Sequence, residues 1–119
     1  MNNQQEKSRS IRQVIQSQHN DKHLLELAKS YAYEYLSNEH DRNPYPTEEA
    51  IEQLSIFDEN MPEVSQDAED ILRLLHKNGS PTTVVHTGGR YFGFVNGGVI
   101  PVSLAARWIS DAWDQNCAL

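Results

Sequence analysis

The sequence predicts a mostly α-helical chain interrupted by one irregular, glycine-rich stretch. Two observations carry this prediction. Apolar residues recur at three- and four-residue spacing in separate segments, which is the pattern of helices that bury one face. Five of the six glycines fall between Gly88 and Gly98, where the helical pattern breaks. The length of 119 residues allows one small domain, and the apolar content of 38% makes a stable isolated monomer doubtful.

The first clear helix is expected to follow Asn20 or Asp21, either of which can cap it, and to end near Asn38. Its apolar stripe comprises Leu24, Leu27, Ala28, Tyr31, Ala32 and Tyr35. Residues 1–10 offer almost nothing to bury, and Ile11, Val14 and Ile15 then fall at helical spacing. Residues 1–19 are therefore expected to form a disordered or arm-like tail, in which a short helix fits the spacing.

Two shorter helices are predicted next, capped by Thr47 and Ser65. Their apolar faces comprise Ala50, Ile51 and Leu54 in the first, and Ala68, Ile71, Leu72 and Leu75 in the second. Gly79 suits the left-handed position after a helix, and Pro81 prevents its continuation. The β-branched run at residues 82–86 is a weak strand signal.

The last predicted helix begins at Pro101, because proline is favoured in the first helical turn. Its stripe comprises Leu104, Ala105, Trp108, Ile109 and Ala112. No glycine, proline or polar tail marks a stop after it. The preceding glycine-rich segment combines a flexible backbone with aromatic side chains, so we expect it to need more protein or a ligand to order it.

Composition excludes several classes of function. A net charge of -7 with ten scattered basic residues opposes binding to nucleic acid. Cys117 is the only cysteine, so no intrachain disulfide forms, and no signal peptide or membrane-spanning segment is recognisable. We therefore expect a cytoplasmic protein that binds neither nucleic acid nor a membrane.

The sequence predicts no catalytic or metal-binding residue in this chain. The five histidines lack the spacing of a zinc site. The glycines lack the lysine and hydroxyl partners of a phosphate loop. Gly97 and Gly98 precede a helix start, where free amides attract anions, but the competing interpretation is that the glycines let the backbone pass close to neighbouring elements.

The glycine-rich segment and the helix after it resemble one enzyme family. The resemblance rests on residues 89–98 (GRYFGFVNGG), followed by Pro101, Leu104-Ala105, Trp108 and residues 113–116 (WDQN); Ser80-Pro81 and His86 also suit the pattern. These residues resemble the N-terminal part of the group II pyridoxal-phosphate-dependent amino-acid decarboxylases, of the aspartate aminotransferase superfamily. The resemblance extends from about Leu24 to Leu119 and is specific from Ser80 onward.

The resemblance implies that residues 20–119 are the N-terminal helical region of a fold type I α/β enzyme, truncated before its cofactor-binding domain. It implies a homodimeric parent that removes the α-carboxylate of an L-amino acid. Phe94, Val95, Asn96 and Gly97 would line the substrate entrance, and Gln115 and Asn116 would lie at the dimer interface near the active site. Family members carry their Schiff-base lysine and main pyridoxal 5'-phosphate contacts further along the chain, so no covalent cofactor is expected here.

Two other functions stay open. The chain could be a stand-alone helical interaction module that pairs through its last helix, or a non-functional remnant of a truncated gene. The identity of the amino-acid substrate also stays open.

Overall fold

The computed structural model describes residues 10–94 and 96–116, which form five α-helices and three short helical turns. The helices are α1 (Ile11–Asn20), α2 (His23–Asn38), α3 (Glu48–Glu52), α4 (Ala68–Leu74) and α5 (Pro101–Trp113). The 3₁₀ turns are Gln53–Phe57 and Ser80–Thr82, and Leu75–Gly79 is a π-helical turn. This part of the chain contains no strand. The predicted mostly α-helical class is confirmed.

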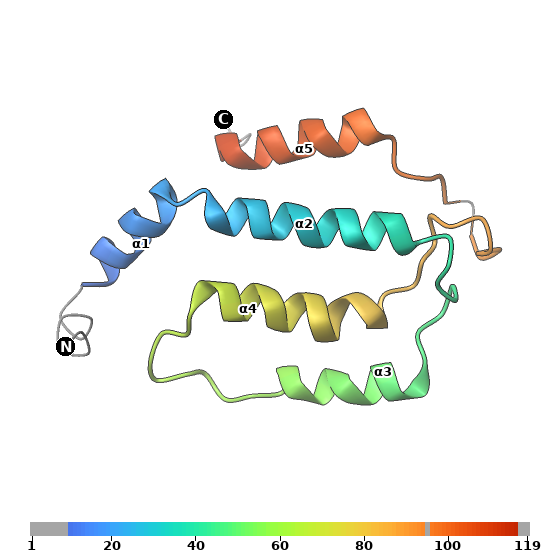
Figure 1. Ribbon diagram of the computed structural model, residues 1–119, viewed down its shortest axis with the longest axis horizontal. Coiled ribbons are helices and arrows are strands. Elements are labelled where there is room, and N and C mark those ends of the chain that lie inside the picture. The colour runs from blue at the N-terminus through green and yellow to red at the C-terminus, as the bar shows by residue number, and fades with distance from the viewer. Residues whose placement is uncertain (1–9, 95, 117–119) are drawn as a thin grey trace.

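Helix α2 occupies the middle of the structure, with α4 on one side and α5 on the other (Figure 1). Helices α2 and α4 run in the same direction, so their ion pairs occur in the same order along both helices. His23 of α2 lies 3.1 Å from Glu69 of α4, and Glu34 lies 3.3 Å from His76 in the π-helical turn that continues α4. Helix α1 leans away from the beginning of α2 (Figure 1). Residues 11–19 belong to this helix, as the apolar spacing allowed, and residues 1–9 of the expected tail lie outside the described residues.

Side-chain caps explain where α1 and α3 begin, and a side-chain hydrogen bond from the first amide of α2 supports the beginning of that helix. Ser10 and Gln13 form a reciprocal capping box at α1. A carboxylate oxygen of Asp21 accepts a hydrogen bond from the His23 amide at 2.9 Å, and the Thr47 hydroxyl accepts one from the Ala50 amide at 3.2 Å. The predicted cap Thr47 and the predicted end at Asn38 are confirmed. The predicted cap of α2 is wrong, because Lys22 rather than Asn20 or Asp21 holds the N-cap position and makes no side-chain cap.

The predicted boundaries of α4 are wrong at both ends. Asp67, not Ser65, caps the helix, because its carboxylate accepts hydrogen bonds from the amides of Glu69 and Asp70 at 2.9 and 3.3 Å. Gly79 is right-handed, with φ -85°. The helix instead runs into the π-helical turn, where the buried Asn78 amide donates to the Leu74 carbonyl at 3.1 Å. The Asn78 side chain thus supplies a hydrogen-bond donor to a carbonyl near the end of the helix. Backbone amides supply such donors where a helix ends at a left-handed glycine.

The weak strand signal at residues 82–86 is also wrong. The segment is extended after the 3₁₀ turn, but its backbone does not pair with another strand among the described residues. The Val85 amide donates one hydrogen bond to the Pro44 carbonyl at 2.8 Å. Val85 is 2% exposed and is the one buried apolar residue in the described part of the chain. The β-branched run therefore supplies an anchor rather than a strand.

Two arginines hold the segment from Ser80 to Tyr91 against the end of α2. Arg42 donates to the carbonyls of Ser80 and Pro81 at 3.0 and 3.3 Å, and its guanidinium lies 5.1 Å from the centre of the Tyr35 ring. Arg90 donates to the carbonyls of His40, at 2.6 Å, and of Arg42. The planar guanidinium can reach two carbonyls at once, which suits it to fastening two irregular segments together.

Helix α5 begins as predicted, with Pro101 in its first turn. It ends at Trp113, because Asp114 adopts the left-handed conformation with φ 48°. Asp tolerates this conformation better than most residues with a side chain. The stop is therefore local, although the sequence shows no glycine or proline there.

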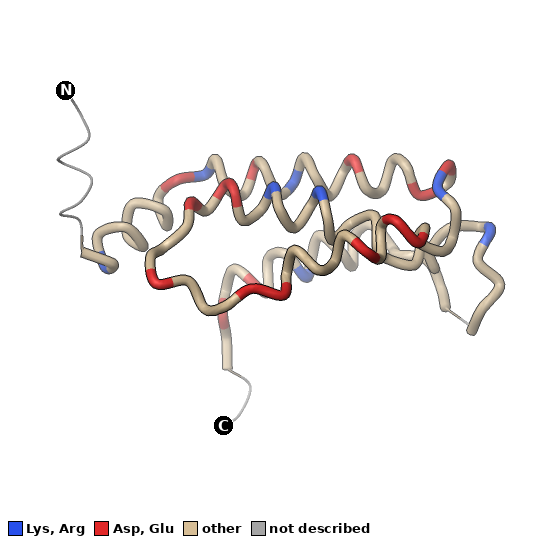
Figure 2. The backbone as a smooth tube through the Cα atoms, turned by 90° about the horizontal axis from the view of Figure 1, so that it is seen from below, with Lys and Arg blue, Asp and Glu red and all other residues tan. Residues whose placement is uncertain are grey.

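Charged residues are spread over the whole described chain. Figure 2 shows the Lys and Arg residues scattered among more numerous Asp and Glu residues. The described residues show no basic stripe of the kind that nucleic-acid-binding proteins carry. That the chain does not bind nucleic acid stays a prediction. Among the described residues, no helix is long and apolar enough to cross a membrane.

The cap of α4 gives a first test. Replacing Asp67 with Ala removes the acceptor for two amides, which costs about 1 kcal/mol in typical helices. We expect the amides of Glu69 and Asp70 to exchange with solvent roughly fivefold faster in Asp67→Ala, measured by hydrogen exchange with NMR detection. Ser65→Ala is the control and should leave both rates unchanged; faster exchange in that variant would restore Ser65 as the cap.

Candidate functional site

The residues expected to line the substrate entrance lie on an exposed loop. Phe94 is 89% exposed and left-handed, with φ 34°, and Asn96 and Gly97 are exposed as well. Val95 lies outside the described residues. The described members of this set do not line either of the two apolar pockets discussed below. Their role in substrate binding therefore stays a prediction.

The two residues expected at the dimer interface follow α5 directly. The Gln115 side chain donates to the Trp113 carbonyl at 2.7 Å, which ties it to the end of the helix. Gln115 and Asn116 are both exposed. Their position beside the apolar face of α5 suits an interface, and the interface itself stays a prediction.

The first part of the glycine-rich segment, residues 87–91, is anchored at three points and forms what we call the stem. Thr87 donates to the Glu39 carboxylate at 3.0 Å, and Arg90 reaches two carbonyls after α2. The Tyr91 ring packs against Tyr45 and His86, with ring centres 5.9 and 6.4 Å apart. The exposed tip, with Phe92 and Phe94, therefore rises from a fixed base.

The interpretation that the glycines let the backbone pass close to neighbouring elements holds at some positions and not at others. A Cβ on Gly88 would lie 3.1 Å from the Glu39 carbonyl, so close approach explains that glycine. Nothing among the described atoms lies within 4 Å of the same position on Gly89, Gly97 or Gly98. At these three positions the expected close approach is wrong, and glycine contributes backbone freedom instead.

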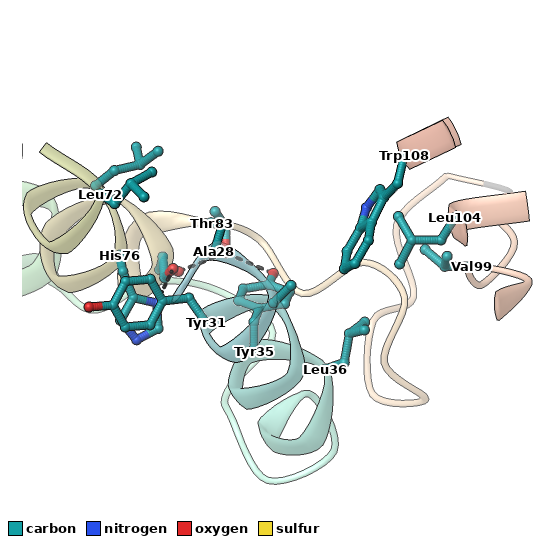
Figure 3. A pocket seen from close by; sticks show the side chains of 14 residues that line it. Ala28, Tyr31, Tyr35, Leu36, Leu72, His76, Thr83, Val99, Leu104 and Trp108 are labelled. Atoms are coloured by element: carbon teal, nitrogen blue, oxygen red, sulfur yellow. Dashed lines mark hydrogen bonds between the residues drawn. The ribbon is translucent and has the colours of Figure 1, made fainter. Parts of the chain in front are cut away.

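Two apolar pockets lie between α2 and α5, with four residues in common. The α4-side pocket has a volume of about 570 Å³ and the loop-side pocket about 420 Å³. The shared wall comprises Leu36, Val99, Leu104 and Trp108, which Figure 3 shows on the side of the α4-side pocket nearest α5. These volumes fall in the range of small-molecule sites, but convergent polar groups are what would make such a site specific.

Polar groups on the α4-side pocket are paired with one another. The hydroxyls of Tyr35 and Thr83 lie 2.8 Å apart, and the Tyr31 and His76 rings stack with centres 4.0 Å apart (Figure 3). His76 Nε2 faces Glu34 and Nδ1 lies 3.4 Å from the Ser80 hydroxyl. This arrangement ties α2 to the turn after α4.

The Glu34, His76 and Ser80 side chains carry the residue types of a nucleophilic triad, but the backbone around Ser80 does not suit one. A serine nucleophile needs amide donors for the developing oxyanion. The Ser80 amide already donates to the Leu75 carbonyl, and the next residue is Pro81, which has no amide hydrogen. The cluster is therefore a packing element.

Groups with displaced pKa values lie away from both pockets. The hydrogen bond that Lys29 donates to the Glu26 carboxylate raises the pKa of Lys29. The pKa of Glu49 is lowered by backbone hydrogen bonding in the first turn of α3 and by the Thr47 side chain. Neither residue lines an apolar pocket. Displaced titration inside a cleft is a mark of active sites, and these two shifts give no such mark.

The described lysines lie outside both apolar pockets. Lys22 is exposed in the turn before α2, Lys77 is exposed in the π-helical turn after α4, and Lys29 is paired with Glu26. Neither apolar pocket is lined by a lysine or an arginine that could meet a phosphate. No group of three or more metal-binding side chains occurs among the described residues.

Comparisons of the chain with protein-family profiles, with curated proteins and with solved structures found no match. Sequence reasoning found both helix stripes that bound the pockets, but not the pockets, because nothing in either stripe says what lies opposite it.

The α5 stripe generates a prediction about the isolated chain. Trp108, Ile109 and Trp113 are 42%, 53% and 65% exposed, and an apolar surface of this kind promotes association. We expect the chain to self-associate or to be partly molten, as measured by sedimentation and near-ultraviolet dichroism.

Ile109→Ser should shift the sedimentation profile toward the monomer, because it places a hydroxyl in the middle of the stripe. Ser110→Ala is the control on the same helix and should change little. A wild-type chain that sediments as a sharply melting monomer at micromolar concentration would contradict this prediction.

Proposed function

We propose that this chain acts as the N-terminal helical region of a pyridoxal-phosphate-dependent amino-acid decarboxylase of fold type I. In this role it contributes to subunit association and to the substrate entrance, and a separate protein body carries the cofactor. The proposal joins the resemblance of residues 80–119 to that family with one property of the structure: the described chain builds almost no core of its own.

The missing core is the observation that carries the proposal. A compact chain of 13.6 kDa exposes about 6,600 Å². This chain exposes 10748 Å². Its radius of gyration is 18.1 Å, against about 13.5 Å for a compact domain of this length. Surface on this scale is normally covered by other protein.

The size and character of the open surface favour an obligate interface. Obligate interfaces bury roughly 2,000–5,000 Å² in total and are more apolar than transient ones. Helix α5 offers a matching face, since most of its apolar side chains are exposed and it stands apart from α2 across the two pockets. The predicted interface residues Gln115 and Asn116 extend this face at its end.

The loop supports the substrate-entrance part of the proposal. Its stem is anchored by Thr87, Arg90 and Tyr91, whereas Phe92 and Phe94 are 93% and 89% exposed. An anchored stem with an apolar tip can present aromatic groups at a fixed place on a neighbouring surface. The described residues supply no catalytic group, so decarboxylation would depend on the cofactor-bearing body.

A stand-alone helical interaction module is the second candidate, favoured by the same open pockets. The reading frame after the codon for Leu119 separates the candidates. An in-frame continuation that encodes a cofactor lysine supports the decarboxylase, whereas a stop codon supports a module or a gene remnant. If a stop codon is found, stable and stoichiometric association of the purified chain with itself or with a partner would favour the interaction module over the gene remnant.

The cofactor prediction can be tested on the isolated chain. Because the described lysines are exposed or ion-paired, we expect borohydride reduction with pyridoxal 5'-phosphate to give no specific label. Peptide mapping by mass spectrometry provides the measurement. Stoichiometric labelling of one lysine would show that the chain holds the cofactor itself.

The entrance prediction needs the full enzyme that contains this region. Gly97→Leu adds a side chain at the predicted entrance, and we expect kcat/KM to fall roughly tenfold, or about 1.4 kcal/mol. The visible absorbance of bound cofactor should survive. Gly89→Leu is the matched control, because Gly89 is equally open but lies in the stem. An equal fall in kcat/KM in both variants would show that the segment has a purely structural role.

A further inference from the structure

We infer that α5 pairs with the α5 helix of a second copy of this chain, in antiparallel orientation. The contact uses an apolar stripe of α5 that turns away from both pockets, which we call the outer stripe: Val102, Ala106, Ile109 and Trp113. The inference rests on the subunit association proposed above and adds the partner and the geometry of the contact. It does not depend on decarboxylase chemistry, which the reading frame after Leu119 tests separately.

Helix α5 carries two apolar faces, and α2 can cover only one of them. Leu104, Ala105 and Trp108 line the loop-side pocket and therefore face α2. At about 100° per residue, the members of the outer stripe lie within about 60° of one another and roughly 120° away from that face. The side chains of the stripe are accordingly open, with Val102 72% exposed and Trp113 65% exposed.

The spacing of the outer stripe suits packing against another helix. Its members follow one another at intervals of four, three and four residues, which is the spacing of a seam between two paired helices. The positions that flank the stripe carry small, uncharged side chains, so a second helix can approach closely: Ser103, Ala105, Ser110 and Ala112.

The charge of the chain favours this face for contact between two copies. Each copy has a net charge of -7, so two copies repel one another over most of their surface. The charged residues within α5, Arg107 and Asp111, pair with one another at 3.9 Å. Both lie on the side of α5 away from the outer stripe. The outer stripe is therefore a neutral surface at which like-charged copies can meet.

The exposed area is sufficient for a stable dimer. This chain exposes about 4,000 Å² more than a compact chain of its mass. An obligate homodimer buries roughly 2,000 Å² or more over both chains. A second copy therefore covers part of the open surface and leaves the rest for the cofactor-bearing body.

The sizes of the side chains favour the antiparallel orientation. A two-fold axis can place Trp113 on Val102 of the second copy and Ile109 on Ala106 of the second copy, so that each large residue meets a small one. A parallel pair would instead place Trp113 against Trp113 and Ala106 against Ala106. The antiparallel pair also brings Asp114 beside the start of the other α5, which has no side-chain cap and whose dipole favours a carboxylate.

Disulfide trapping between two chains tests the register. In a Cys117→Ser background, a Val102→Cys chain is mixed with a Trp113→Cys chain and oxidised mildly. The antiparallel pair brings these positions within the roughly 7 Å that a disulfide requires. Two copies of Val102 lie about 16 Å apart along the helix axis in this register, too far to be joined. The matched control mixes Val102→Cys with Asp111→Cys, because Asp111 lies at nearly the same height on the far side of α5.

We expect the mixed disulfide between the Val102→Cys and Trp113→Cys chains at a yield several-fold above that of the control, read by mass spectrometry. Equal yields, a predominant Val102→Cys homodimer, or no disulfide above the control would overturn the antiparallel pair. If the chains still sediment as dimers in that case, they associate through another surface, and the proposed subunit association stands.

Exchanging the sizes of one facing pair gives a second test that uses no cysteine. Ile109→Ala leaves a gap opposite Ala106, and Ala106→Ile crowds Ile109. We therefore expect each single variant to raise the dimer dissociation constant roughly tenfold or more, measured by sedimentation. The double variant again places a large residue opposite a small one and should return to within about threefold of the unmodified chain. Tighter association of Ala106→Ile alone, or a double variant weaker than either single one, would contradict the facing pair.

Discussion

Arg42 and Arg90 hold the segment from Ser80 to Tyr91 against the end of α2, and the rest of the structure depends on this contact. The two guanidinium groups reach carbonyls on both sides of the junction. Between them Val85 is buried, and its amide bonds to the Pro44 carbonyl. These bonds join parts of the chain about 40 to 50 residues apart.

The consequence is a framework whose centre is polar and whose faces are apolar and open. Hydrogen bonds and ion pairs set where α2, α4 and the stem lie, as the Tyr35–Thr83 and Glu34–His76 contacts illustrate. Helix α5 lies across two pockets from α2 and leaves most of its apolar stripe exposed. A chain of this kind is suited to be completed by more protein, because burial of apolar surface is the main stabilising term in folding.

The loop combines opposite properties within a few residues. Its stem is fixed by hydrogen bonds and stacked rings, whereas its tip presents two exposed phenylalanines beside open glycines. Order at the base fixes where the exposed rings stand, and the open glycines leave room around the backbone of the tip. The proposed entrance role draws on this division.

The sequence by itself determined the helical class, the starts at Thr47 and Pro101, and the apolar stripes, because caps and periodicity act over three or four residues. The sequence did not predict the end of α4, because the buried Asn78 side chain, and not a left-handed Gly79, bonds to the carbonyl of Leu74. It also suggested a strand around Val85, which is instead a buried anchor. Only the tertiary structure decided that the stripes of α2 and α5 face each other across unfilled pockets. The guanidinium–carbonyl bonds that hold the stem likewise join distant backbone atoms, and no local pattern records such contacts.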